Sequence, residues 1–314
     1  MQEQIVRAYF SRTFSDFLKT IFPFKVQKIS IDAGFTCPNR DGKKGQEGCT
    51  YCNNQTFSPQ YAENKKPVGQ QLDEGIRFFS RKYPQMKYIA YFQSYTNTYD
   101  SIENLLAKYS EALNYPDVVG LIIATRPDCM PDELLDVLEK IASEYFVLIE
   151  YGIESTCNET LQRINRGHTY EDAVDAILRT AARKIYTGVH LILGLPGESR
   201  ETILSHADKI SSLPITTVKL HQLQLIRNTQ LARQVEEHPE IFHAYTVEEY
   251  IDLCIDFMKR LNPDFIIDRF VSQSPKDLLI APAWGLKNHE FTAKLMKRLS
   301  YFINPSGNVI INSF

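Results

Sequence analysis

Short apolar runs alternate with helical patterns along most of this 314-residue chain, and this alternation limits the fold more than any other feature. The runs are almost continuously apolar, which is typical of parallel strands covered on both faces. Six strands are expected, at 29–33, 87–93, 118–125, 146–152, 188–193 and 216–223. Helices are expected between them, at 70–82, 101–113, 131–144, 159–164, 171–183 and 200–211. Six βα units in order predict an α/β protein with a partial (β/α)6 barrel, and an open doubly wound sheet is the alternative.

The pattern predicts one compact core between two extensions. An N-terminal extension, 1–27, is expected to hold a short amphipathic helix from Tyr9 to Leu18. The core barrel is expected to occupy 28–225. A C-terminal extension, 226–314, is expected to pack on the core, with a helix at 247–261, a strand at 265–270 and a helix at 287–302.

Composition narrows the class of protein. The chain is 43% hydrophobic and 23% charged with a formal net charge of −3, an ordinary globular composition that gives no overall sign of nucleic-acid binding. Both ends are locally basic: residues 1–30 carry five Lys or Arg against two acids, and 285–314 carry four against one. These ends are either solvated helix faces or a rim that binds phosphates.

The compartment follows from two absent signals. No run approaches the roughly 18 apolar residues of a membrane span, and no signal peptide is recognised at the start. A cytoplasmic protein without membrane association is therefore expected. Thiols stay reduced there, so the six cysteines indicate metal ligands and buried thiols more than disulfides.

Three cysteines follow the first expected strand with the spacing Cys-x11-Cys-x2-Cys: Cys37, Cys49 and Cys52. In a parallel barrel, functional residues collect at the carboxyl ends of the strands, which is where this loop lies. Three thiolates can hold three irons of a [4Fe–4S] cube and leave the fourth iron open to a small molecule. Zinc favours four ligands, typically in two pairs, so a zinc-stabilised binding protein is the alternative of another class.

Later strands also end in polar residues. Glu150 and Glu154 are evenly spaced on the fourth strand, so both are expected to face the lumen, where they would meet an ammonium group or ribose hydroxyls. An internal salt bridge, for instance to Arg126, is the alternative. Gly194 and Gly197 follow the fifth strand, and glycines there let the backbone approach a flat ligand closely.

Four further residues have two interpretations each. Cys129 and Cys157 follow the third and fourth strands and could supply a catalytic thiol, although their spacing is poor for a second cluster. Arg269 would bind a substrate anion or pair with an acid such as Asp268. Trp284 would pack the terminal helix down or stack on a base.

The segments Asp-Ala-Gly-Phe-Thr-Cys37-Pro-Asn-Arg-Asp-Gly and Gly48-Cys49-Thr-Tyr-Cys52 resemble those of radical S-adenosylmethionine (SAM) enzymes. Within that superfamily they are similar to the YhcC/YtqA-like branch, a relative of the radical half of the elongator catalytic subunit. The gap of eleven residues is longer than the common Cys-x3-Cys-x2-Cys and is typical of this branch. The resemblance implies that the three cysteines ligate a [4Fe–4S] cluster, whose open iron binds SAM and cleaves it to methionine and a 5′-deoxyadenosyl radical.

The resemblance also implies where SAM is bound. The expected contacts lie at the ends of the second, fourth, fifth and sixth strands: Gln93, Ser94, Glu150, Gly152, Glu154, Ser155, His190, Gly194, Gly197, His221 and Leu223. The Gly-Gly-Glu motif that meets the SAM amino group in the family is absent, and Gln93 and Ser94 stand in its place.

The elongator relationship implies a transfer RNA (tRNA) substrate, modified at carbon 5 of the wobble uridine. Similar Gram-positive proteins imply removal of the carboxymethyl group from 5-carboxymethylaminomethyl-(2-thio)uridine, which leaves the 5-aminomethyl form. An electron donor such as flavodoxin or ferredoxin and a methyltransferase that acts on the product would be partners. A splayed wobble base could stack on Tyr95, Tyr99 or Trp284. A radical SAM enzyme for a small metabolite or porphyrin-like substrate is the alternative.

Overall fold

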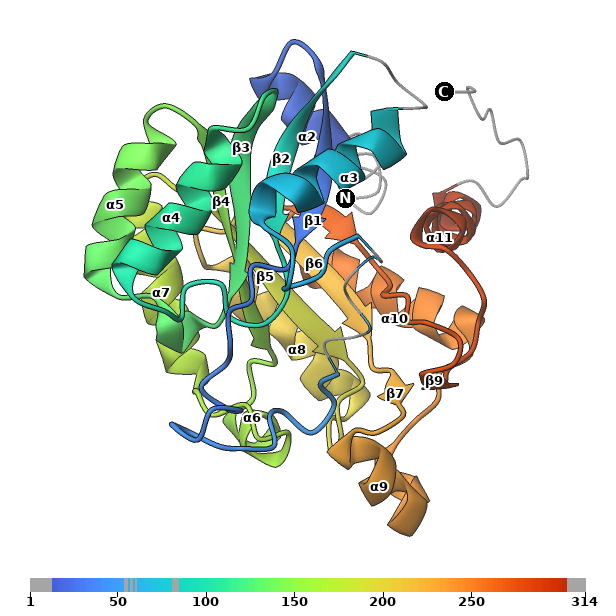
Figure 1. Cartoon of the computed structure of the whole chain (residues 1–314). Coiled ribbons are helices and arrows are strands. Elements are labelled where there is room, and N and C mark those ends of the chain that lie inside the picture. The colour runs from blue at the N-terminus through green and yellow to red at the C-terminus, as the bar shows by residue number, and fades with distance from the viewer. Residues whose placement is uncertain (1–12, 54–55, 57–58, 60, 81–84, 304–314) are drawn as a thin grey trace.

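A parallel sheet of seven strands forms the centre of the protein in the computed structural model, which describes residues 13–53, 56, 59, 61–80 and 85–303. The sheet curls into a partial barrel, surrounded by helices (Figure 1). Its strands, in spatial order, are β1 (Lys25–Ile31), β2 (Met86–Phe92), β3 (Val118–Thr125), β4 (Phe146–Glu154), β5 (Tyr186–Leu193), β6 (Thr217–Gln222) and β8 (Ile266–Arg269). Every neighbouring pair is parallel. The predicted α/β partial barrel is therefore confirmed.

Two strands differ from the sequence-based expectation. β1 begins at Lys25 rather than Ile29, because its first residues are polar or half-buried at the sheet edge and carry no apolar pattern. The strand expected at 265–270 joins the barrel itself, since β8 pairs with β6 through Thr217 and Ile266. β1 and β8 are the two edges of the sheet.

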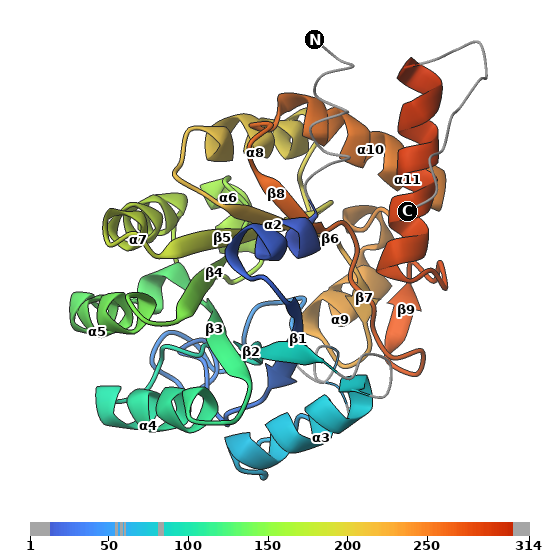
Figure 2. The same ribbon diagram turned by 90° about the horizontal axis from the view of Figure 1, so that it is seen from above.

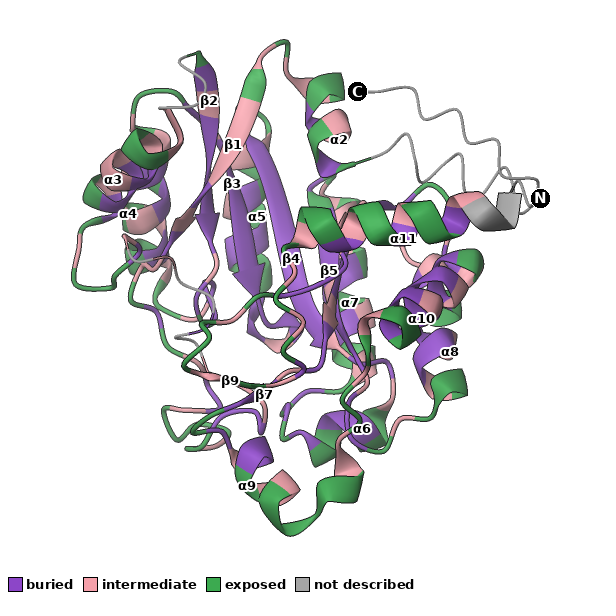
Figure 3. Ribbon diagram, turned by 90° about the vertical axis from the view of Figure 1, so that its right-hand side faces the viewer, coloured by how far each residue is buried: buried purple, intermediate pink, exposed green. Residues whose placement is uncertain are grey.

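Helices follow the strands and cover the outer face of the sheet. They are α3 (Val68–Ser80), α4 (Ile102–Leu113), α5 (Asp132–Ala142), α6 (Asn158–Arg163), α7 (Tyr170–Ala182), α8 (Arg200–Ser211) and α10 (Val247–Arg260). Serine or threonine N-caps start several of them, and Thr169 and Thr246 form capping boxes with Asp172 and Glu249. The strands are buried between these helices and the barrel interior (Figure 3).

One helix closes the amino end of the barrel. α2 (Phe14–Ile21) begins at the N-cap Thr13 and lies across the ring of strands when the barrel is viewed from above (Figure 2). Its Phe14 and Leu18 pack with inward-facing residues such as Ile122 and Leu148. The part of the predicted 9–18 helix before residue 13 lies outside the described residues, as do parts of both basic ends. The amino half of the lumen is thus filled with apolar side chains, so polar chemistry is left to the carboxyl half.

The C-terminal region packs beside the open edge of the barrel. It contains β7 (Leu225–Ile226), α9 (Gln230–Glu237), β9 (Leu279–Ala281) and α11 (Asn288–Ile303), and β7 pairs antiparallel with β9. Trp284 stacks on Phe291 of α11 and donates from its ring nitrogen to the Tyr245 carbonyl at 2.9 Å, so it packs the terminal helix. Within the described ranges, no helix combines the length and apolarity needed to cross a membrane.

Candidate active site

A cavity at the carboxyl ends of the strands gathers most of the predicted site residues. Those that line it are Cys37, Cys49, Cys52, Gln93, Glu150, Gly152, Glu154, His190, His221 and Arg269. They come from the loop after β1 and from β4, β5, β6, β8 and the end of β2. Parallel strands end at the same edge of a barrel, which is why segments more than 200 residues apart meet here.

The cysteine loop has a fixed local geometry. The Cys52 amide donates to the Cys49 carbonyl at 3.0 Å, which closes the Cys-x2-Cys turn. Arg40 donates to the Cys52 carbonyl at 2.9 Å. Gly48 has a φ of +80°, a backbone conformation that favours glycine, and a Cβ there would displace the Arg40 guanidinium, which lies 2.9 Å away.

Two donors reach the sulfur of Cys49, one from another segment of the chain and one from the loop itself. Arg166, just after α6, lies 3.6 Å from this sulfur and also donates to the Gly152 carbonyl of β4. The Asn39 amide lies 3.5 Å from the same sulfur and donates to the Asn165 carbonyl at 2.7 Å. Donors of this kind favour a thiolate, so this end of the cavity is suited to an anionic ligand of a metal.

The cysteines suit a cluster more than a single ion. Burial, and then the neighbouring Cys49, raise the pKa of the Cys52 thiol to about 11, so a thiolate there needs positive charge such as iron supplies. In the described part of the chain, no three His, Cys, Asp or Glu side chains converge on one metal-ion position. In a [4Fe–4S] cube each cysteine binds a different iron, so the three sulfurs need only face a common space.

Glu150 is the centre of a buried network in the lumen. It accepts hydrogen bonds from Lys219 at 2.7 Å, from Tyr91 at 2.8 Å and from His190 at 3.0 Å. Although burial opposes ionisation, Lys219 and His190 lower the pKa of Glu150 well below its usual value. The internal salt bridge considered as the alternative is therefore present, with Lys219 in place of Arg126, which pairs with Asp128 at 2.9 Å. Burial lowers the pKa of His190 to about 4, so this imidazole is neutral at physiological pH.

Glu154 reaches the same cavity by a different route. The β4 ladder shifts register between Gly152 and Glu154, and Glu154 has a φ of +65°. This irregularity interrupts the simple alternation expected from the spacing of the two acids. Glu154 still lines the cavity, 3.6 Å from Arg166, and burial raises the pKa of its carboxyl group.

Several residues that were expected to contact SAM do not line this cavity. Among the described residues that do not line the cavity are Ser94, Ser155, Gly194, Gly197 and Leu223. Ser94 hydrogen-bonds Asp32, and Ser155 donates to Glu198 at 2.6 Å. A Cβ on Gly194 would come within 2.7 Å of Tyr245, so this glycine permits close packing of the fold. Leu223 lines a small neighbouring pocket.

The two candidate thiols also lie away from the cavity. Cys129 ends a short 3-10 helix after β3 and lines a separate surface pocket with Tyr99, and burial raises the pKa of its thiol. Cys157 is the N-cap of α6, with its thiol 2.9 Å from Glu159. Of the proposed stacking residues, Tyr95 is 36% exposed and lines the cavity.

Arg269 does not pair with Asp268. Its guanidinium lies 2.8 Å from the Nε2 atom of His221. Asp268 instead pairs with Lys28 at 2.9 Å and with Lys219 at 3.3 Å. The predicted pairing of Arg269 with Asp268 is therefore wrong, and the binding of a substrate anion stays a prediction.

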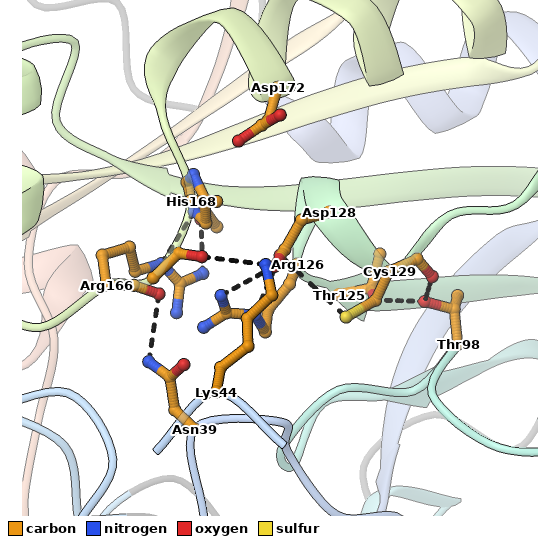
Figure 4. A network of polar contacts seen from close by, with 12 residues as sticks. Asn39, Lys44, Thr98, Thr125, Arg126, Asp128, Cys129, Arg166, His168 and Asp172 are labelled. Carbon is orange, nitrogen blue, oxygen red and sulfur yellow. Dashed lines mark hydrogen bonds and ion pairs between the residues drawn. The ribbon is translucent and has the colours of Figure 1, made fainter.

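Sequence reasoning missed Arg40 and Arg166, two arginines near the cysteine loop, and gave the third, Arg126, the wrong partner. Figure 4 shows how Arg126, Asp128 and Lys44 connect the end of β3 to the loop. Burial opposes ionisation of Asp128, but hydrogen bonds from Arg126 lower the pKa of its carboxyl group to about 2. Burial, and then Arg166, lower the pKa of His168 to about 3. The polar segments that follow β3 and α6 contain Arg126 and Arg166, and these segments were the sequence signal for the two arginines.

Residues 37–210 match the family described as the Radical SAM superfamily, and residues 215–301 match the Radical_SAM C-terminal domain. The chain therefore belongs to the radical SAM superfamily, which implies a [4Fe–4S] cluster and SAM as cofactors and replaces the zinc-stabilised alternative. It is 32% identical to the protein YtqA of Bacillus subtilis, over 90% of this chain and 87% of that protein. It is also 32% identical to the protein YhcC of Escherichia coli, over 83% of this chain and 82% of that protein.

Two more distant similarities are a sequence match to a tRNA acetyltransferase and a structural match to a solved protein. The tRNA uridine(34) acetyltransferase of Methanocaldococcus infernus is 30% identical over 154 residues, 47% of this chain and 27% of that protein. The structure of Methanocaldococcus infernus Elp3 with an N-terminal deletion has a TM-score of 0.65 at 18% identity, covering 90% of this chain and 63% of that chain. At this identity, the structural likeness concerns the fold alone.

Proposed function

We propose that this radical SAM enzyme modifies the wobble uridine of tRNA. The observation that carries the proposal is the 30% identity to a tRNA uridine(34) acetyltransferase, a protein named for that nucleotide. The matched part covers only 27% of that protein, so its acetyl-transfer activity is not carried over.

The reaction that we propose removes the carboxymethyl group of 5-carboxymethylaminomethyl-(2-thio)uridine and leaves the 5-aminomethyl form. The methylene of this group would lose two electrons, balanced by the reductive cleavage of SAM, and water would hydrolyse the resulting imine, so that the two carbons leave as glyoxylate. This choice rests on the cysteine motif, which resembles the YhcC/YtqA-like branch, and on the 32% identity to members of that branch. A methyltransferase would consume the product, and flavodoxin or ferredoxin would supply electrons.

In this proposal, Cys37, Cys49 and Cys52 hold the [4Fe–4S] cluster. When bound, the cluster supplies the electron that cleaves the sulfonium of SAM, the chemistry of the superfamily. Arg166 and Asn39 orient Cys49 through its sulfur. α2 closes the amino end of the barrel and keeps water out of the lumen, while the network around Glu150 fixes the polar wall on which ligands are oriented.

Mass spectrometry of tRNA nucleosides from a strain that lacks the gene tests the proposal. The strain should accumulate 5-carboxymethylaminomethyl uridines and lose the aminomethyl and methylated forms. The wild-type gene should restore the pattern, whereas a gene encoding Cys49→Ala should not. Cys157→Ala, outside the cavity, is the matched control and should restore it. Unchanged 5-substituted uridines in the deletion strain would remove the tRNA proposal and favour a small-molecule substrate.

A further inference from the structure

A second cavity of about 990 Å³ opens beside the barrel. Its lining includes Lys28 on β1 and Asp268 on β8, the two edge strands of the sheet. Gln93 and Arg269 line both this lateral cavity and the cavity that contains the cysteines. A ligand in the lateral cavity would thus meet these two side chains where it approaches the cofactor site. The volume is at the upper end of the range for small-molecule sites.

Charges at this junction do not balance. Lys28 pairs with Asp268, and Lys219 pairs with Glu150 at 2.7 Å. Arg269 makes no ion pair with an acid in the described part of the chain, and its guanidinium contacts the imidazole of His221. Burial, and then Arg269, lower the pKa of His221 well below its usual value, so this histidine is neutral and offers no compensating charge. One positive charge is therefore left over at the inner end of the lateral cavity.

Arg269 also has an unused donor. Its Nε atom is buried and has no hydrogen-bond partner among the described residues. A buried guanidinium donor without a partner costs free energy, which an anionic ligand would recover through a charge-assisted hydrogen bond. A carboxylate matches the planar fork of a guanidinium group.

The other buried arginine donor without a partner, Nη1 of Arg126, belongs to the cysteine end. Arg126 lines the cavity that contains the cysteines and is not among the residues that line the lateral cavity. Arg269 instead lines both cavities, with its guanidinium against the imidazole of His221. An anion next to the cluster, such as the carboxylate of SAM, therefore has Arg126 available, while Arg269 is left for an anion that enters from the side.

We propose that Arg269 binds a carboxylate of the substrate at the inner end of the lateral cavity, an inference that rests on the proposed function. The outer part of this cavity carries Tyr61, Phe78 and Phe79, and Phe78 is 67% exposed. A base would stack on this aromatic rim while the carboxymethylaminomethyl arm extends inward. Its carboxylate would meet Arg269, which places the carbon atoms of the arm next to the cofactor cavity.

The test compares two anticodon stem-loop RNAs on the cluster-loaded enzyme. One carries 5-carboxymethylaminomethyl uridine, and the other carries its neutral carboxamide. The wild-type enzyme should bind the carboxylate RNA at least about tenfold more tightly, because one charge-assisted hydrogen bond is at stake. Arg269→Gln should reduce this preference to less than about twofold, and Arg269→Lys should keep an intermediate preference because it keeps the charge without the fork. Arg260→Gln, a charge removal on α10, is the control and should keep the full preference.

Two results would overturn the inference: equal binding of both RNAs by the wild-type enzyme, or an undiminished preference in Arg269→Gln. A raised KM for SAM in Arg269→Gln with the RNA preference intact would assign this arginine to SAM instead. The wild-type comparison decides the matter even if the variant does not fold. Nucleoside analysis of the product is read separately: a carboxylate preference without aminomethyl product refutes the proposed function alone, whereas product formation with no role for Arg269 refutes this inference alone.

Discussion

The two ends of the active-site cavity are built on different principles. At the cysteine end, Arg40 donates to the Cys52 carbonyl and Arg166 contacts the Cys49 sulfur, so both arginines hold the cysteine loop. At the β8 end, lysines and acids form ion pairs across the lumen, and Arg269 has no acidic partner in the described chain. The difference indicates that one end fixes a permanent group, whereas the other keeps a charge available for a ligand that binds and leaves.

The largest expected effect comes from the cysteine end. Cys49→Ala removes the thiol that Arg166 and Asn39 contact and should abolish the cluster. Iron analysis and visible absorbance after anaerobic reconstitution measure the loss, and formation of 5′-deoxyadenosine from SAM and dithionite should stop. Full cluster content in this variant would refute the ligand assignment, and Cys157→Ala should behave as wild type.

Lys219→Met tests the ion pairs at the β8 end. It leaves Glu150 and Asp268 short of a cation in a buried site, so the free energy of unfolding should fall by about 3–5 kcal/mol. Urea unfolding measures the change. The double variant Lys219→Met, Glu150→Gln should recover part of the loss, because the uncompensated charge is removed. No recovery would show that the network is not coupled as described.

Arg166→Gln and Arg269→Gln compare the two ends directly. Arg166 supports a cysteine ligand, so its loss should speed iron release to a chelator by about tenfold, as for other groups that orient metal ligands. The guanidinium of Arg269 contacts His221 rather than a cysteine, so the Arg269→Gln variant should release iron at the wild-type rate. Equal rates in the two variants would erase the distinction between the ends.

The smallest expected effect is a dependence of stability on pH. Burial lowers the pKa of His190 to about 4 and that of His168 to about 3, whereas the unfolded chain protonates both near pH 6.5. Below that pH the unfolded state binds more protons, so stability falls as the pH drops. Each histidine should contribute about 1 kcal/mol to the loss between pH 7.5 and 5.5.

Urea unfolding at the two pH values, with cluster content followed in parallel, checks this expectation. His190→Gln tests the lumen and His168→Gln tests the cysteine end, and each should remove its own share of the pH dependence. His289→Gln, on the exposed surface of α11, should leave the dependence unchanged. A pH dependence that survives in both buried-histidine variants would contradict the assignment.

Much of the fold was predictable because its signals are local. Apolar runs and capping residues located six barrel strands and their helices, and the cysteine spacing after the first strand identified a loop that lines the cavity. The polar start of β1 was missed because an edge strand need not be apolar. Ser155 and Gly194, expected at the cofactor, do not line the cavity: Ser155 donates to Glu198, and a Cβ on Gly194 would meet the Tyr245 ring. The position of a residue in a motif does not fix its neighbours in the fold.

The sequence by itself determined the alternation of strands and helices, the three cysteines and the superfamily that they indicate, since each depends on residues close together in the chain. Only the tertiary structure decided the pairing of charges. It placed β8 beside β6 and paired Lys28 and Lys219 with Asp268. It also left Arg269, between two cavities, without an acidic partner among the residues that the structure describes. These partners lie up to 240 residues apart, and spacing along a chain carries no information about which buried charge remains uncompensated once the barrel has formed.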